Sequence, residues 1–245
     1  MTADDNLLAH AEPPPFERAW ADLILLSLAW GIAWSGIWGG AWMLFGDYGL
    51  LIMPAAAAMA TFCLWPFRRA LAALAEIVGG RNRTARSLAA TVLVVLLTLC
   101  LIRLRPNSYR SENVLPFWAA WLRPRDQLYR VLILMPLWGA WAMIVAVQFC
   151  RHTHRTEEAV AAFARCGPIP AAGLMGALLA VTILYFNFLP WWQLSISGVT
   201  ILAAIGGGLV LARLTGGPTR RSLLAGNVLT QIVFILAYLA NTAGR

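Results

Sequence analysis

Long apolar runs separated by short polar connectors dominate the chain. A run of about 20 mostly apolar residues is enough to cross the hydrocarbon core of a bilayer as a helix. Seven such runs cover approximately residues 20–45, 50–67, 87–104, 128–150, 168–188, 194–211 and 223–240. They are too long and too uniformly apolar for the alternating pattern of barrel strands. The sequence therefore predicts an all-α, polytopic transmembrane helical bundle of about seven spans, within a range of six to eight.

Three connectors carry further structural signals. The residues GDYG at 46–49 predict a tight turn that joins the first two spans into a hairpin. In 67–87, arginines flank an apolar stripe of Leu71, Leu74, Ile77 and Val78, as in an amphipathic helix on an anionic leaflet or on a soluble partner. The segment 111–122 predicts a second, shorter interfacial helix.

Composition places the chain in one class of protein. Because 60% of its residues are apolar and only 12% are charged, it is expected to be an integral membrane protein. Residues 1–19 form an acidic, proline-rich tail without the basic start of a cleaved signal peptide, so the first span is expected to be retained. Residues 20–245 then form a single transmembrane domain, and the lack of eukaryotic features favours the bacterial cytoplasmic (inner) membrane.

The arginines indicate an orientation. All 19 basic residues are arginine. With the N-terminus inside, twelve of them fall in inner segments and seven in outer segments. Because cytoplasmic loops keep the positive charge, this distribution favours a cytoplasmic N-terminus and an outer C-terminus.

The exception to this bias is the segment 103–130, which combines arginines with tryptophans. Its candidate anion or lipid-phosphate ligands are Arg103, Arg105, Arg110, Arg123, Arg125 and Arg130. Trp118 and Trp121 in this segment, and Trp191 and Trp192 further on, are expected to anchor the membrane boundary. Two interpretations stay open: the arginines extend separately to lipid phosphates, or several converge on one anionic ligand.

Cys150, His152, His154 and Cys166 form a second, weaker candidate site. Two thiols and two imidazoles are a ligand set that zinc accepts. However, the two histidines lie two residues apart, unlike the well-spaced ligand pairs of zinc motifs. A polar loop is therefore preferred, and no metal or other cofactor is predicted.

Polar and small residues within the spans predict helix contacts. Asn227, Thr230 and Gln231 share one face of the last span, where they either bond to a neighbouring helix or line a substrate path. Glycines permit close approach of helix backbones. The candidate glycines are Gly36, Gly40, Gly173, Gly176, Gly206, Gly207 and Gly208.

The usual catalytic signatures fail. The chain has no lysine for a Schiff base or a phosphate-binding loop, and no histidine in the last spans to activate Ser197. The first functional hypothesis is therefore a non-catalytic membrane subunit of a multi-protein complex, as a transporter component or a scaffold. The alternative is a transferase or flippase that handles a lipid-linked or phosphorylated anionic substrate through the arginine-rich segment. Expected partners are membrane lipids and other membrane or peripheral subunits, with no nucleic acid.

Overall fold

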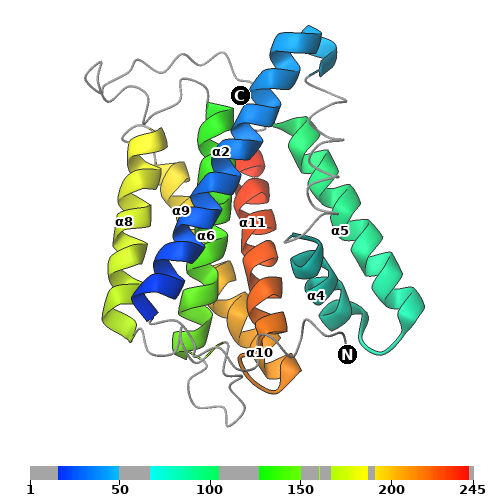
Figure 1. Cartoon of the computed structure of the whole chain (residues 1–245), viewed down its shortest axis with the longest axis vertical. Helices are drawn as coiled ribbons and strands as arrows, with labels where there is room; N and C mark the ends of the chain where they lie inside the picture. Colours follow the sequence, from blue (N-terminus) through cyan, green and yellow to red (C-terminus); the bar gives the residue numbers. More distant parts are fainter. Residues whose placement is uncertain are drawn as a thin grey trace.

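The structure is a computed structural model that describes residues 16–49, 67–104, 127–149, 160, 167–186 and 191–242. Within these ranges the chain is helical, without strands (Figure 1). The elements in chain order are α2 (Phe16–Gly49), α4 (Phe67–Gly79), α5 (Arg83–Arg103), α6 (Gln127–Phe149), α8 (Pro168–Phe186), α9 (Trp191–Leu202), the π-helical turn η2 (Ala203–Gly207), α10 (Gly208–Thr215) and α11 (Arg220–Thr242). The all-α prediction is thus confirmed for the described part of the chain.

Five helical segments in this part are long and apolar enough to cross a membrane. They cover Arg83–Leu101, Tyr129–Phe149, Pro168–Phe186, Ser195–Thr215 and Arg220–Asn241. Each coincides with a span expected from the sequence, and together they support an integral membrane protein. The expected span at 50–67 and the interfacial helix at 111–122 lie outside the described residues.

α6 is the central helix of the bundle. It packs against α2, α8 and α11, and 89% of its apolar span is buried inside the protein, compared with 17% for α5. Its two tryptophans supply much of the core: Trp138 and Trp141 meet edge to face at 5.6 Å, and Trp138 stacks on Phe234 of α11. The indole of Trp141 also donates a hydrogen bond to the carbonyl oxygen of Ala171 in α8, at 3.2 Å. These aromatic contacts join α6 to two neighbouring helices.

The predicted turn at 46–49 is wrong. These residues form the last turn of α2, which continues without interruption to Gly49. A single glycine inside a helix costs only about 1 kcal/mol, so Gly46 does not end it.

α4 begins at Phe67, where the amphipathic pattern begins, but its apolar stripe is covered by protein. Leu71 and Leu74 are buried, and the helix packs against α5 and α11. Only Val78 of the predicted stripe is exposed. Gly80, in the left-handed conformation with φ 60°, then turns the chain toward α5. Asn82 caps α5 by accepting a hydrogen bond from the Thr84 amide at 2.9 Å.

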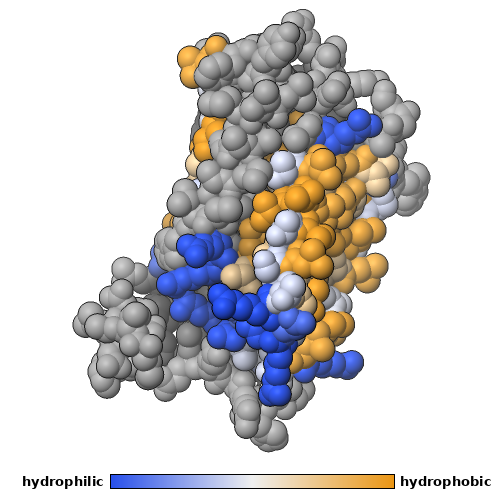
Figure 2. Space-filling model, turned by 90° about the vertical axis from the view of Figure 1, so that its right-hand side faces the viewer, coloured by the Kyte–Doolittle hydropathy of each residue, from blue (hydrophilic) through white to orange (hydrophobic). Residues whose placement is uncertain are grey.

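The helix ends define two ends of the bundle (Figure 1). The lower end holds the α4–α5 turn, the start of α8 and the connection from α10 to α11. The upper end holds the end of α5, the start of α6 and the end of α11. α5 presents exposed apolar residues between these ends, and Figure 2 shows that hydrophilic residues gather at the lower end of this face. This distribution is the one expected of a helix with one side against lipid.

Candidate functional site

Only two of the six predicted anion ligands lie in the described part of the chain, and their environments differ. Arg103 is exposed at the last turn of α5. Arg130 is fully buried in the first turns of α6. Its guanidinium Nη1 donates a hydrogen bond to the carbonyl oxygen of Tyr185, near the end of α8, at 2.6 Å. The convergence of the six arginines on one anion therefore stays a prediction. Arg130 itself connects α6 to α8 through its hydrogen bond to Tyr185.

The remaining predicted residues fall largely outside the described residues. This applies to Arg105, Arg110, Trp118, Trp121, Arg123, Arg125, Cys150, His152, His154 and Cys166. Trp191 and Trp192 are the first residues of α9, but their side chains are not described. Among the residues that the structure describes, no group of three or more histidines, cysteines or acids could hold a metal ion.

The polar residues of α11 form an amide pair against α6. Gln231 donates a hydrogen bond from Nε2 to Oδ1 of Asn227, whose Nδ2 donates to the sulfur of Met143 at 3.3 Å. Gly139 of α6 makes room for the pair, because a Cβ atom there would lie 2.8 Å from Nε2 of Gln231. The described residues offer no partner to two further buried atoms nearby on α11, Oε1 of Gln231 and Oγ1 of Thr230.

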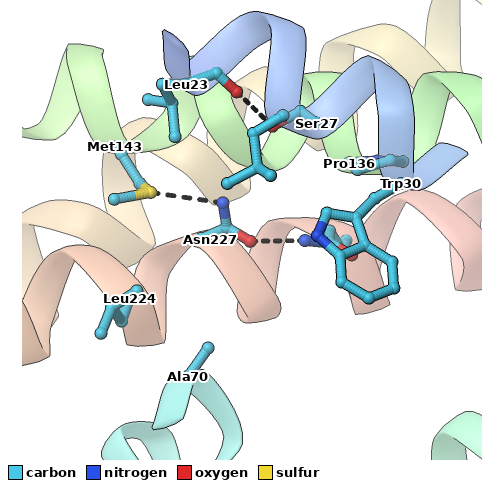
Figure 3. Close-up of a pocket in the computed structure, with 10 residues that line it drawn as sticks. Leu23, Ser27, Trp30, Ala70, Pro136, Met143, Leu224 and Asn227 are labelled. Carbon is cyan, nitrogen blue, oxygen red and sulfur yellow. Dashed lines mark hydrogen bonds between the residues drawn. The ribbon is translucent and has the colours of Figure 1, made fainter. Parts of the chain in front are cut away.

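This amide pair lines a pocket of about 100 Å³ between α2, α4, α6 and α11, which we call the amide pocket (Figure 3). Most of its wall is apolar. The residues that line it are Leu23, Leu26, Ser27, Trp30, Ala70, Pro136, Met143, Leu224, Asn227 and Gln231. The pocket thus offers amide groups inside an apolar setting, which suits a small polar group attached to an apolar one.

A second hollow, of about 420 Å³, lies between α4 and the start of α11. It is lined by Arg69, Ala72, Ala73, Glu76, Arg220, Arg221 and Leu224, and we call it the basic cleft. Arg221 forms an ion pair with Glu76 across the cleft, with 3.4 Å between Nη1 and Oε2. Leu224 lines both hollows, so the basic cleft adjoins the amide pocket there.

Comparison of the chain with protein-family models, with curated proteins and with solved structures finds no match.

Sequence reasoning did not identify the basic cleft. Arg69 is expected to flank the apolar stripe of the amphipathic segment 67–87, and Arg220 and Arg221 contribute to the positive charge on the inner side of the membrane. The only signals in the sequence are a charged pair at the start of each helix and the lone acid Glu76 on α4. Neither signal indicates that α4 and α11, which are distant along the chain, lie side by side.

Proposed function

We propose that the protein is a non-catalytic membrane subunit that assembles laterally with a transmembrane helix of another membrane protein through the outer face of α8. The observation that carries this proposal is the composition of that face. Its exposed residues include Ala172, Gly173, Gly176, Ala177 and Ala180. A Cβ atom added at Gly173 or Gly176 would meet no atom of the described chain within 4 Å.

The same protein offers a contrasting surface on α5. There the exposed residues include Leu88, Val92, Val95 and Leu99, which are large and aliphatic. Large side chains of this kind suit contact with mobile acyl chains. α8 also exposes Ile169, Val181 and Leu184 near its ends. Between them its small residues form a strip with spacings of four residues, from Ala172 to Gly176 to Ala180 and from Gly173 to Ala177.

Small residues at this spacing favour helix association in a bilayer. Apolar area gives little driving force there, because lipid tails are as apolar as leucine, and close van der Waals packing drives association instead. A partner helix can approach the α8 backbone closely only where side chains are absent or short. The outer face of α8 fits this requirement and the face of α5 does not.

The test is photo-crosslinking in native membranes. A benzophenone amino acid replaces Ala180 on α8 or, as the matched control, Val95 on α5. We expect position 180 to form a covalent adduct with another polypeptide, identified by mass spectrometry, and position 95 to react with lipid alone. Adducts with lipid alone at both positions, or with a second copy of this chain at position 180, would contradict the proposal.

A second set of variants tests whether the small residues cause the association. Gly176→Leu places a large side chain in the strip and should abolish the adduct from position 180. Val95→Leu changes the size of an exposed residue on α5 and should leave the adduct intact. An unchanged adduct in the Gly176→Leu protein would mean that the strip is not the contact surface.

The alternative function, the handling of an anionic lipid-linked or phosphorylated substrate, stays a second proposal. The basic cleft is the specific observation in its favour, and the described arginines of the 103–130 segment add no further support. Such a function needs an anion-binding surface at a membrane boundary, and the arginines of α4 and α11 that line the basic cleft are candidates for it.

A further inference from the structure

The basic cleft joins two helices that each bring arginine to the same hollow. α4 contributes Arg69 and Glu76, and α11 contributes Arg220 and Arg221. Three arginines against one glutamate give the lining side chains a net charge of 3 − 1 = +2. With about 420 Å³ of space, the hollow can hold an anionic group of several atoms.

Arginine is the residue best suited to bind phosphate at such a place. Its planar guanidinium group stays charged and donates parallel hydrogen bonds to two oxygens of one phosphate. Arg69 and Arg221 are both exposed, so a ligand can reach them. Because Arg221 also contacts Glu76 at 3.4 Å, an incoming anion competes with this carboxylate for the same guanidinium group.

The surroundings of the cleft favour a ligand with an apolar chain. On α11, residues 220, 224, 227 and 231 follow one helical stripe, which passes from an arginine through Leu224 to the amide pair over about 16 Å. Leu224 is shared with the amide pocket, whose wall is mostly apolar. In that pocket Gln231 is 2% exposed, and its Oε1 accepts no hydrogen bond from the described residues. A lipid can use the arginines and this apolar wall together, whereas a free phosphate uses only the arginines.

We propose that the basic cleft binds the phosphate group of an anionic lipid, with its apolar part directed past Leu224 toward the amide pocket. Glu76 is a counter-ion within the cleft and weakens binding by pairing with Arg221. This inference does not depend on lateral assembly through α8. It also differs from an anion site in the 103–130 segment, because it uses the arginines of α4 and α11. The start of α11 lies at the end of the bundle opposite to the end of α5 and the start of α6 (Figure 1).

The test measures lipid binding to the full-length protein in detergent by native mass spectrometry. Phosphatidic acid is the probe, and phosphatidylcholine and inorganic phosphate are the comparison ligands. Three variants each change one charge: Arg69→Gln and Glu76→Gln in the cleft, and Arg83→Gln at the exposed start of α5, outside the cleft lining. Circular dichroism melting of each variant checks that it is folded.

We expect Arg69→Gln to weaken phosphatidic acid binding about tenfold, because a hydrogen bond to a charged group contributes roughly 1.5 kcal/mol or more. Glu76→Gln should strengthen binding severalfold, since it removes the competing carboxylate, and a folding defect would not produce that gain. Arg83→Gln should leave binding unchanged within about twofold.

Three results would overturn the proposal. Equal losses in Arg69→Gln and Arg83→Gln would show general attraction to a basic surface. Unchanged or weaker binding of phosphatidic acid to Glu76→Gln would show that Glu76 does not compete with the phosphate for Arg221. Inorganic phosphate that binds as tightly as phosphatidic acid, or that displaces it at equal concentration, would assign the cleft to a free anion in place of a lipid.

Discussion

At the scale of single residues, the guanidinium group of Arg130 stands out because it is a charged group that is fully buried in the described structure. A buried charge is tolerated only where hydrogen bonds replace its water. Tyr185 is the next-to-last residue of α8, so its carbonyl oxygen lacks a partner within the helix. The contact with Arg130 at 2.6 Å therefore stabilises a helix end and an otherwise costly charge together.

Replacement of Arg130 by methionine tests this structural role. Arg130→Met keeps an unbranched apolar stem but removes the donor, which leaves the Tyr185 carbonyl oxygen without this hydrogen bond. We expect the free energy of unfolding to fall by about 1–3 kcal/mol. The measurement is the thermal unfolding midpoint in detergent, with Arg103→Met, an exposed arginine of the same predicted set, as the unaffected control. A midpoint equal to that of the unchanged protein would contradict this role.

Residue patterns predicted the polar groups of the last span but not their surroundings. The spacing of Asn227 and Gln231 indicates a shared helical face, and the two amides do bond to each other. Nothing in the sequence shows that Met143 lies within reach of Asn227, because this contact depends on how α6 and α11 meet. Sequence reasoning also treated the arginines at 103 and 130 alike, since burial follows from the fold.

At the scale of helices, close packing depends on glycines that the sequence does not distinguish. Gly31 of α2 lies against α6, where an added Cβ atom would be 2.7 Å from the Cα atom of Ile133. At Gly36 of the same helix, a Cβ atom would meet no described atom within 4 Å. The predicted close approach is confirmed at Gly207 and Gly208, where such an atom would lie 2.7 Å from Leu229 and 2.8 Å from Ala146. A motif search finds pairs of glycines, but only the structure shows which of them face a neighbouring helix.

Alanine substitutions in α2 separate these two kinds of glycine. Gly31→Ala forces α2 away from the α6 backbone and should lower the free energy of unfolding by roughly 1–3 kcal/mol. Gly36→Ala adds a better helix former in open space and should be neutral, or stabilising by up to about 1 kcal/mol. Both are measured by thermal unfolding in detergent. If the two variants unfold at the same temperature, the close packing of α2 on α6 at Gly31 is wrong.

At the scale of the whole molecule, position along the membrane normal was easier to predict than lateral arrangement. The length and apolarity of a run indicate whether it can cross, and α6 and α11 begin and end within a few residues of the predicted bounds. The order of helices around the bundle depends on side-chain shape, which a hydropathy pattern does not contain. For this reason the apolar stripe of α4 was expected to face lipid or a partner, although α5 and α11 cover it. The basic cleft was missed for the same reason.

The arrangement of the helix ends predicts on which side of the membrane each connector lies. α5 has 21 residues, which span about 30 Å at about 1.5 Å per residue and match the hydrocarbon core. Asn82 and Arg103, which are exposed at its two ends, should therefore face opposite compartments. Arg221 is the second residue of α11, which starts at the same end of the bundle as α5, so Arg221 should share the compartment of Asn82 (Figure 1).

Cysteine accessibility measures this topology. Single cysteines replace Asn82, Arg103 or Arg221 in a chain whose four native cysteines are changed to alanine. A membrane-impermeant maleimide is then applied to intact cells and to inverted vesicles. Because the positive charge of 67–87 favours the cytoplasm, we expect Arg103→Cys to react in intact cells, and Asn82→Cys and Arg221→Cys to react only in inverted vesicles. Labelling of positions 82 and 103 from the same side would mean that α5 does not cross the bilayer. Labelling of 82 and 221 from opposite sides would separate the two halves of the basic cleft, which requires both helix ends in one compartment.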